Sequence, residues 1–549
     1  MEVLMSRITQ LLFDNPVSEA KGLWSGSDVS ELTFRSWDRL RATAGRVAAG
    51  LAEAGVVPGD SVAILAGPAD NVAVAIQAIW MRGAVFTMLH QPTPRMNLET
   101  WLADTRAVIE MLGARLVVAG EPFTDSVRDL DLGASIAVIE ELAERTETIE
   151  HVTTTENDIA VLQLTSGTTG VPKAVAISYG NLYQNHAALA ARMGFTSDDV
   201  GIGWLPLYHD MGMIGLLVTP MLAQATTVIT SPVAFLKNPL SWAEMISRFG
   251  GNFTAAPNFA YAVLARRLRR APEGAYDLSS VRIAVNGAEV VDEAALLEFL
   301  DVAGRFGFRA EALMPAYGMA EATLAVAFAD ADAHYSVDVI DSERAEGEGV
   351  VDRASVEKSW TLMRLGTPVP GIELKVVDGA GVRLPADHIG EILIRGDAVA
   401  RRYLLPDGYV TAVDSEGWLA TGDLGYLTEA DETVVTGRKK DIIIVSGRNI
   451  APTTVERAAA NVAGVRSGGV AALAVRLPGM AREGIAVIAE SDHAEDAEQC
   501  EQVRKEVARA VYDDIGIAPV VVTIVHKGAL PKTPSGKLRR STAASLIPS

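Results

Sequence analysis

The chain has 549 residues, 49% of them hydrophobic, which is enough apolar material for two or three cores and predicts a multidomain globular protein. Its formal net charge of -21 argues against nonspecific binding to nucleic acid, which needs a basic surface. The single cysteine, Cys500, excludes an internal disulfide framework and any cysteine metal cluster.

The N-terminus does not resemble a targeting segment. MEVLMSRITQLLF lacks the continuous apolar core and the cleavage site of a signal peptide, which favours a cytoplasmic location. Residues 211–235 contain no charged residue and are long enough to span a bilayer. Because Gly212, Gly215, Pro220 and Gln224 interrupt this stretch, we expect a buried helix followed by a buried strand, and no integral membrane association.

Helical and strand patterns alternate from the N-terminus past residue 300. Residues 32–55 predict a strand entering a helix, residues 60–67 predict a buried strand, and residues 71–89 repeat the scheme. This alternation favours α/β layers with largely parallel sheets. After about residue 365 the sequence changes to short strands and glycine-rich turns, which predicts a β-rich subdomain over about 365–435.

A polar loop, LQLTSGTTGVPKAV at 162–175, follows a strand-like apolar lead. Glycine backbone N-H groups, hydroxyls and a lysine together suit phosphate oxygens. The spacing differs from the common NTPase loop, because Lys173 lies three residues after Gly170 and precedes Ala174. Taken alone, such a stretch is more often an ordinary polar loop.

Six motifs in order resemble the adenylate-forming superfamily of acyl-CoA synthetases, peptide-synthetase adenylation domains and luciferases. They are TSGTTGVPKA (165–174), WLPLYHDMG (204–212), YGMAEAT (317–323), TGDLGY (421–426), GRKKDIIIVSGRNI (437–450) and LPKTPSGKLRR (530–540). The resemblance implies a large α/β N-terminal domain of layered subdomains, residues 1–437, a hinge at 438–441, and a small mobile α+β C-terminal domain, residues 442–549. It also implies ATP-dependent activation of a carboxylate with release of pyrophosphate.

The reaction explains the residue types around the phosphates. A carboxylate attacks the α-phosphate while pyrophosphate departs, so positive charge and aligned dipoles must offset the repulsion between anions. The resemblance implies that Glu321 holds Mg²⁺, a hard cation suited to one carboxylate plus phosphate oxygens. The residues expected to hold the β- and γ-phosphates are Thr165, Ser166, Gly167, Thr168, Thr169, Gly170 and Lys173.

The same resemblance gives expectations for the rest of ATP. Tyr317, with Gly318 and Met319, is expected to stack on adenine, whose other side is lined by Gly287, Ala288 and Glu289. Asp423 is expected to accept hydrogen bonds from the ribose hydroxyls, assisted by Arg438. Without the motif series, an Asp after a glycine would be read as a turn residue.

Three further residues receive roles from the resemblance. Lys537 is the expected catalytic cation, which reaches the carboxylate and the bridging phosphate oxygen, although alone it would be read as a solvated lysine. Lys440 matches the pivot of the hinge. His209 is expected to gate or position the substrate, since an ionised carboxylate needs no general base; an ordinary interior histidine is the alternative.

Several details resemble the fatty acyl-AMP ligase branch, and within it the ligases of mycobactin-type siderophore pathways. They are WLPLYHDMGMIG, APNFAY at 256–261, Ala320, and an insertion at about 332–360. The branch implies a fatty acid substrate and, as partner, an acyl carrier protein with phosphopantetheine. GRNIAP replaces the usual GRNHYP of the branch, which leaves thiol presentation in doubt. A fatty acyl-CoA ligase and a non-catalytic acyl- or nucleotide-binding protein remain as alternatives.

The acyl pocket is expected to be a mostly apolar tunnel, since each buried methylene contributes about 0.8 kcal/mol. Candidates for its wall are Trp204, Met211, Asn258, Phe259 and Tyr261, each of which could instead be ordinary core. The insertion could be a tolerated surface loop. Its apolar residues instead predict packing against the body; they are Tyr335, Val337, Val339, Ile340 and Trp360.

Overall fold

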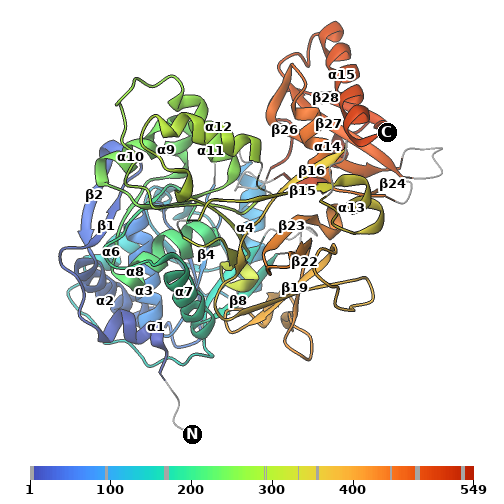
Figure 1. Cartoon of the computed structure of the whole chain (residues 1–549). Coiled ribbons are helices and arrows are strands. Elements are labelled where there is room, and N and C mark those ends of the chain that lie inside the picture. The colour runs from blue at the N-terminus through green and yellow to red at the C-terminus, as the bar shows by residue number, and fades with distance from the viewer. Residues whose placement is uncertain are drawn as a thin grey trace.

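The computed structural model describes residues 5–92, 97–165, 172–289, 291, 293–331, 333–353, 358–445, 448–476, 483–532 and 538–548. Within them, two large, mostly parallel sheets are followed by an antiparallel sheet with an inserted ribbon and by a small α+β domain (Figure 1). The α/β fold with a large N-terminal and a small C-terminal domain is as the sequence predicts.

The first large sheet is parallel in its middle and antiparallel at one edge. In spatial order its strands are β21 (Gly408–Thr411), β20 (Arg402–Leu405), β8 (Lys173–Ser178), β7 (Ile159–Thr165), β4 (Val85–Met88), β3 (Ser61–Leu65), β5 (Leu116–Ala119) and β6 (Ser135–Val138). The strands from β7 to β6 pair in parallel. Helices supply the crossovers that parallel pairing requires: α3 (Ala69–Met81) connects β3 to β4, and α4 (Leu98–Leu112) connects β4 to β5. Helix α2 (Trp37–Glu53) leads into β3 from the second large sheet.

The second large sheet repeats this scheme. In spatial order its strands are β17 (Thr367–Pro368), β14 (Ala325–Phe328), β13 (Leu313–Gly318), β12 (Ile283–Asn286), β11 (Phe253–Ala256), β9 (Val200–Gly203), β10 (Thr226–Ile229), β1 (Gly22–Ser25) and β2 (Thr33–Ser36). Its parallel strands run from β13 to β1. The helices on it include α9 (Pro232–Lys237), α10 (Leu240–Phe249), α11 (Asn258–Leu268) and α12 (Glu293–Gly304).

Helix α7 (Tyr179–Met193) joins the two sheets. It begins with a capping box in which the Ser178 and Asn181 side chains each bind the other's backbone N-H, and it ends at Gly194 with a φ of 58°. The helix follows β8 of the first sheet directly, and its buried Asn185 donates hydrogen bonds to the carbonyls of Ala322 and Ala325 beside the second sheet. These contacts bring the segment after β13 next to the strand that begins at Lys173.

Residues 365–435, which we predicted to form one β-rich subdomain, divide among three sheets, since the short strand β17 belongs to the second large sheet. β18 (Ile372–Val377), β19 (Gly390–Gly396), β22 (Leu419–Leu427) and β23 (Thr433–Arg438) form an antiparallel sheet of their own. The β20–β21 hairpin instead pairs with β8, with Tyr403 opposite Val175. The strand pattern of the hairpin alone does not indicate which sheet it joins, because pairing with β8 and pairing with the antiparallel sheet would both be antiparallel.

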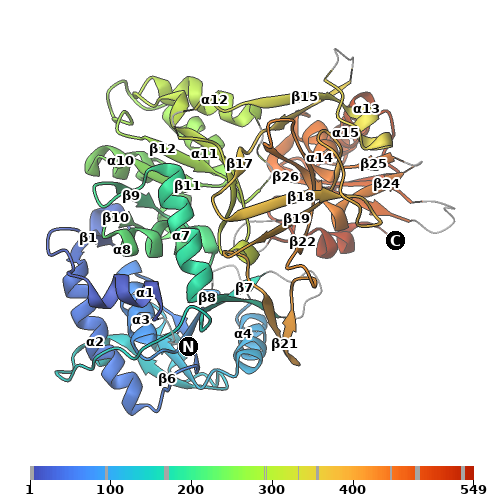
Figure 2. The same ribbon diagram turned by 60° about the horizontal axis from the view of Figure 1, so that its bottom comes forward.

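The C-terminal domain lies beside the inserted ribbon and the antiparallel sheet, as Figures 1 and 2 show. Its core contains Ile443, Val455, Val487 and Val507. The elements are β24 (Ile443–Val445), β25 (Arg448–Ile450), α14 (Pro452–Ala460), β26 (Val465–Val475), β27 (Gly484–Ser491), α15 (Ala497–Ile515), β28 (Val521–Val525) and α16 (Arg540–Ala543). A 3-10 turn, Lys439–Asp441, connects this domain to β23.

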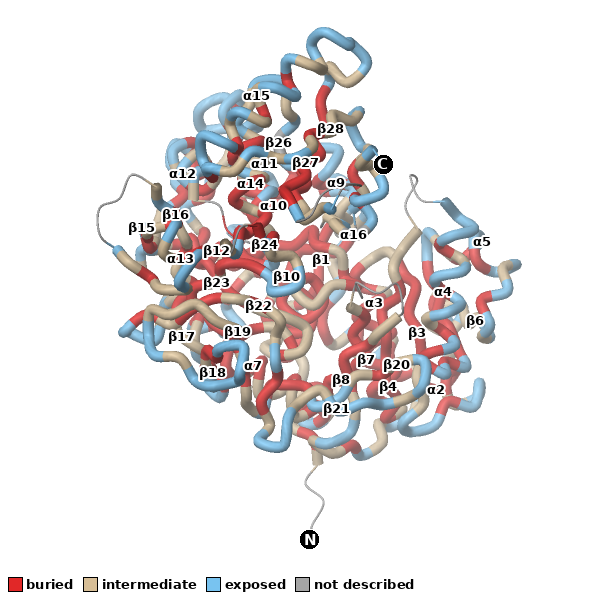
Figure 3. Tube along the Cα trace, turned by 90° about the vertical axis from the view of Figure 1, so that its right-hand side faces the viewer, coloured by how far each residue is buried: buried red, intermediate tan, exposed pale blue. Residues whose placement is uncertain are grey.

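The buried positions are concentrated in the strands, such as β3 and β7, whereas the outer face of α15 is exposed (Figure 3). Residues 211–235 form a π-helix (Met211–Val218), helix α8 (Thr219–Ala223), strand β10 and then α9, which confirms the predicted buried helix and strand. Among the described residues, no helix is both long and apolar enough to cross a bilayer.

The insertion is a ribbon packed on the antiparallel sheet, not a loose loop. It consists of β15 (Val337–Asp341), α13 (Ser342–Glu348) and β16 (Ser359–Met363). Ile340 and Trp360 are buried with Tyr426 and Val434 of the sheet, as predicted, and Tyr335 and Val337 are partly buried. The prediction for Val339 is wrong, because the residue faces away from the sheet and is 49% exposed.

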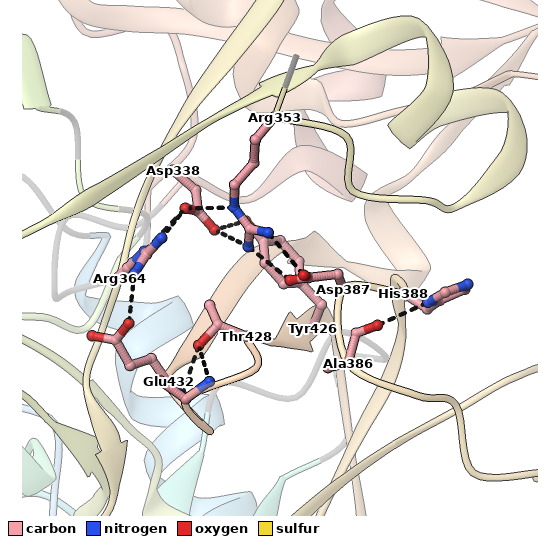
Figure 4. Close-up of polar contacts among 10 residues, drawn as sticks. Asp338, Arg353, Arg364, Ala386, Asp387, His388, Tyr426, Thr428 and Glu432 are labelled. Carbon is pink, nitrogen blue, oxygen red and sulfur yellow. Dashed lines mark hydrogen bonds and ion pairs between the residues drawn. The ribbon is translucent and has the colours of Figure 1, made fainter.

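Asp338 anchors the ribbon through polar contacts. Its side chain is 1% exposed and binds the guanidinium groups of Arg353 and Arg364 and the hydroxyl of Tyr426 (Figure 4). Arg353 also pairs with Asp387, and Arg364 with Glu432. The network therefore joins three carboxylates to two guanidinium groups, all within the large domain.

Candidate active site

The predicted phosphate loop connects β7 to β8. Thr165 ends β7 and pairs with Lys173, the first residue of β8. The other loop residues predicted to contact phosphate lie outside the described residues; they are Ser166, Gly167, Thr168, Thr169 and Gly170. The buried hydroxyl of Thr165 has no hydrogen-bond partner among the described residues, so it is available to a ligand at this end of the strand.

Lys173, at the start of β8, and Glu321, in the 3-10 turn Ala320–Ala322 after β13, lie together beside Tyr403. The Lys173 Nζ lies 3.6 Å from Glu321 Oε1 and 3.8 Å from the centre of the Tyr403 ring. The Tyr403 hydroxyl donates to Glu321 Oε1 at 3.1 Å. Tyr403 was not among the residues we singled out from the sequence, because it sits in a hairpin whose pairing with β8 no local pattern reveals.

A second group of polar residues joins β13 to the antiparallel sheet. The Tyr317 hydroxyl donates to Asp423 Oδ2 at 2.6 Å, and Arg438 Nε lies 3.1 Å from Asp423 Oδ1. Burial raises the pKa of Asp423, which is 4% exposed, whereas the Arg438 charge and the Tyr317 hydroxyl act in the opposite direction. Because both oxygens of Asp423 already have partners, ribose hydroxyls would have to share or replace them.

Residues expected around adenine lie where β12 and β13 end. Ala288 has a φ of 68°, a strained value for a residue with a side chain, of the kind that clusters at binding sites. Glu289 Oε1 accepts the backbone N-H of Phe259 at 2.9 Å, and Gly287 donates to the Ala256 carbonyl. Next to Tyr317, a Cβ on Gly318 would lie 2.2 Å from the Leu324 carbonyl oxygen, so only glycine fits.

His209 belongs to a cluster of rings at the carboxyl end of β4. Its ring centre lies 4.9 Å from that of Tyr208 and 6.4 Å from that of His90, and His90 lies 5.1 Å from Tyr208. We did not single out His90 from the sequence. Its position directly after a predicted parallel strand was the available signal, since ligands bind at the carboxyl ends of such strands.

The C-terminal domain reaches this cluster. Burial and then the positive charge of Arg539 lower the pKa of His90. Lys537 itself lies outside the described residues, two positions before Arg539. Arg540 pairs with Asp441 of the hinge segment at 3.2 Å and with Glu456 at 2.8 Å. The segment that follows Lys537 is therefore held between the hinge and α14.

Lys440, the predicted pivot, lies in the 3-10 turn Lys439–Asp441. Burial lowers the pKa of its ammonium group, and the neighbouring charge of Arg438 acts in the same direction. Asp423 and Lys173 also influence Lys440 electrostatically, so the turn lies close to both groups of polar residues.

The candidate acyl-pocket residues have different environments. Trp204 stacks on Phe235 with 3.8 Å between ring centres, and Trp242 contacts both Trp204 and Tyr261 edge-on. The Tyr261 hydroxyl donates to the Val285 carbonyl. Met211 is partly buried against the same core. At the start of α11, Asn258 is buried and accepts from Asn286, whereas Phe259 is 38% exposed.

The described residues contain no group of three or more His, Cys, Asp or Glu side chains arranged for a metal ion. Glu321 is thus an isolated carboxylate. This donor set fits a magnesium ion that takes most of its ligands from phosphate oxygens and water.

Comparisons with known proteins agree on one family. The family model described as AMP-binding enzyme matches residues 27–404. "Putative ligase Rv1013" of Mycobacterium tuberculosis is 42% identical over 547 residues, 99% of this chain and 100% of the relative. "Putative acyl-CoA synthetase" of Caulobacter vibrioides is 32% identical over 512 residues, 92% of this chain and 89% of the relative.

A third relative and a solved structure extend this likeness. The medium-chain-fatty-acid–[acyl-carrier-protein] ligase JamA of Moorena producens is 34% identical over 397 residues, 70% of this chain and 67% of the relative. A solved structure from studies of fatty acyl-adenylate ligases of E. coli and L. pneumophila has a TM-score of 0.88 and 27% identity. It covers 99% of this chain, which matches 97% of the solved chain.

Proposed function

This chain belongs to the AMP-binding enzyme family, and we propose that it uses ATP to convert a fatty acid to an acyl-adenylate and passes the acyl group to the phosphopantetheine thiol of an acyl carrier protein. A fatty acyl-CoA ligase that uses free CoA is the alternative.

One observation carries the adenylation half of the proposal. Lys173 and Glu321 lie together at the base of the predicted phosphate loop, and the charges of Glu321 and Arg438 both act on the buried Asp423. Lys173 of β8, Glu321 of the turn after β13 and Asp423 of β22 would thus supply a cation, a metal-binding carboxylate and a ribose-binding carboxylate to one nucleotide. This combination suits a magnesium nucleotide whose phosphates point toward Lys173.

In the first step a carboxylate oxygen of the fatty acid attacks the α-phosphorus, and the bond from that phosphorus to the oxygen bridging toward the β-phosphate breaks. Pyrophosphate leaves with the electron pair of that bond. Lys173 would hold the β- and γ-phosphates, and Lys537 would approach the reacting oxygens. Magnesium, when bound at Glu321, supplies charge neutralisation. Ring packing around His209 would keep water from the acyl-adenylate.

In the second step the thiol sulfur attacks the acyl carbon, AMP leaves, and the thiol proton is lost. This step requires the C-terminal domain to turn about Lys440, so that Lys537 leaves and the thiol enters. Proline at residue 440 would restrict φ and remove an N-H. Lys440→Pro should therefore keep acyl-adenylate synthesis and lose acyl transfer; an equal loss in both steps would contradict the pivot role.

The contact between the insertion and the C-terminal domain favours a carrier protein over CoA. Arg448 of β25 binds Glu346 of α13, whose side chain is 1% exposed, and donates to the Ile515 carbonyl at the end of α15. An insertion that binds both domains can bias the position of the smaller one. We propose that this bias disfavours the arrangement that a free CoA thiol requires.

The deciding experiment supplies ATP, a fatty-acid panel, CoA and a phosphopantetheinylated carrier protein, and identifies the products by mass spectrometry. We expect acyl-AMP with every accepted acid, acylated carrier protein, and little acyl-CoA. Lys537→Ala should remove acyl-AMP while ATP binding remains, whereas Lys527→Ala, an exposed lysine of the same domain, should change neither. Rapid acyl-CoA formation would favour the alternative, and absence of acyl-AMP from the wild type would contradict the proposal.

Two expectations remain predictions. The siderophore pathway is tested by the choice of carrier protein, since only carriers of such assembly lines should be acylated efficiently. A cytoplasmic location is tested by fractionation of the source cell.

A further inference from the structure

We propose that Tyr403 is a positioning residue that holds Lys173 and Glu321 apart and oriented for the polyphosphate and its magnesium ion. This inference rests on the proposed function, because it assigns to Tyr403 a part in binding magnesium ATP. Tyr403 itself would touch neither substrate.

The backbone fixes Tyr403 between the two charged residues. On one side, β20 pairs with β8, which begins at Lys173. On the other side, the Ala400 N-H donates to the Glu321 carbonyl at 2.8 Å, and the Thr323 hydroxyl donates to the Ala398 carbonyl at 2.8 Å. The strand that carries Tyr403 is thus tied to both partners, so the position of its side chain is set by the fold.

The phenol hydroxyl orients the carboxylate of Glu321. It donates to Oε1 at 3.1 Å, and Lys173 Nζ also approaches Oε1 rather than Oε2. Oε2 takes no hydrogen bond from any residue within the described ranges, although Glu321 is mostly buried. One oxygen is therefore occupied by the protein, and the other remains available to a cation.

The ring of Tyr403 restrains Lys173. The ammonium group lies 3.8 Å from the ring centre, a distance at which the ring face attracts a cation. Its separation of 3.6 Å from Glu321 Oε1 exceeds that of a good hydrogen bond. The ring thus holds Lys173 near Glu321 without a close ion pair, so incoming phosphates and their cation need not break one.

The raised pKa of the Tyr403 phenol keeps its hydroxyl a hydrogen-bond donor. Burial and then the charge of Glu321 raise the pKa of Tyr403, so the phenol stays protonated at any physiological pH.

Two substitutions separate the hydroxyl from the ring. Tyr403→Phe removes the hydroxyl, and Tyr403→Leu removes both. The matched control is Tyr409→Phe in the same hairpin, whose side chain is exposed and lies beside Arg402. Calorimetry measures ATP binding in EDTA and at increasing Mg²⁺, and pyrophosphate release gives KM and kcat.

For Tyr403→Phe we expect unchanged ATP binding in EDTA and an about fivefold higher Mg²⁺ requirement. For Tyr403→Leu we expect ATP binding in EDTA to weaken as well, by about fivefold, because Lys173 loses its cation–π contact. Both variants should raise KM for ATP more than they lower kcat, and Tyr409→Phe should match the wild type.

A wild-type Mg²⁺ requirement in Tyr403→Phe would overturn the inference, whatever Tyr403→Leu does. If the wild-type protein binds magnesium ATP but never releases pyrophosphate with a fatty acid, the proposed function fails, while the binding data still decide the role of Tyr403. Should Tyr403→Leu fail to fold, Tyr403→Phe retains the ring and remains a complete test.

Discussion

The insertion meets the large domain and the C-terminal domain through two very different interfaces. Toward the large domain, Ile340 and Trp360 share an apolar core with Tyr426 and Val434, and Asp338 binds two guanidinium groups. Toward the C-terminal domain, the polar contact is Glu346 with Arg448, which also binds the Ile515 carbonyl. The first interface resembles a domain core, whereas the ionic contact described at the second is the pair of Glu346 with Arg448.

The pKa values of the two buried carboxylates, Asp338 and Glu346, differ in a way that matches the difference between the interfaces. Burial opposes ionisation of Asp338, but hydrogen bonds from Arg353, Arg364 and Tyr426 lower its pKa overall. Burial raises the pKa of Glu346, and its hydrogen bond with Arg448 compensates only in part. The comparison indicates that the insertion is a fixed part of the large domain that holds the C-terminal domain through a contact that can be broken.

Breaking the interface between the insertion and the large domain should cause the largest loss of stability. Asp338→Leu leaves Arg353 and Arg364 without their shared partner, and we expect a loss of about 3 kcal/mol in the free energy of unfolding. Denaturation in urea, followed by tryptophan fluorescence, measures it. A loss below about 1 kcal/mol would mean that Asp387 and Glu432 alone satisfy the two arginines.

Breaking the second interface should cost less stability and change domain position more. Glu346→Gln keeps the size of the side chain and removes its charge, so we expect a loss of about 1 kcal/mol. Tryptic cleavage in the hinge at 438–441 should accelerate about fivefold as the C-terminal domain separates. Glu343→Gln breaks a surface pair with Lys358 on the same insertion and should not change the cleavage rate. Equal rates in both variants would argue against a holding role for Glu346.

The smallest expected effect is a change with pH in the contact between the insertion and the C-terminal domain, without a change in the contact with the large domain. Because the folded pKa of Glu346 lies above its ordinary value of 4.5, the folded protein takes up a proton there first as pH falls, and the ion pair with Arg448 is lost. The network of Asp338, whose pKa lies below its ordinary value of 3.8, keeps its contribution to stability through this range. That contribution is lost only as pH falls through the folded pKa of Asp338.

Small-angle scattering can detect this difference. As pH falls through the folded pKa of Glu346, which lies above 4.5, the wild type should expand slightly as the C-terminal domain separates, and Glu346→Gln should already be expanded and change little. An expansion of the same size in Glu346→Gln would assign the pH dependence to other groups.

Much of the fold follows from local patterns. Residues 32–55, 60–67 and 71–89 form the strands and helices that their periodicity predicts, since an amphipathic period depends only on nearby residues. The β20–β21 hairpin shows the limit of such patterns. Its alternation predicts strands, but pairing with β8 depends on residues more than two hundred positions away, and that pairing is what brings Tyr403 to Lys173.

At the candidate site, too, the sequence predicted some features and missed those that depend on contacts between distant residues. Motif order was sufficient to name Lys173, Glu321, Asp423 and Arg438, because a charged nucleotide needs those residue types in any arrangement. It did not predict that the Tyr317 hydroxyl binds Asp423, or that His90 lies beside His209. Both contacts join segments that are far apart in the sequence, so they depend on how the ends of distant strands and the loops that follow them meet.

The sequence by itself determined the family resemblance, the elements of the large domain, and the chemical types at the nucleotide site. It also located the insertion and the apolar residues that fix most of it. Only the tertiary structure decided that the insertion binds the C-terminal domain through Glu346 and Arg448, and that Tyr403 lies between Lys173 and Glu321. Local patterns record the preference of each segment for helix, strand or burial, whereas contacts between distant segments are set by the packing of whole sheets.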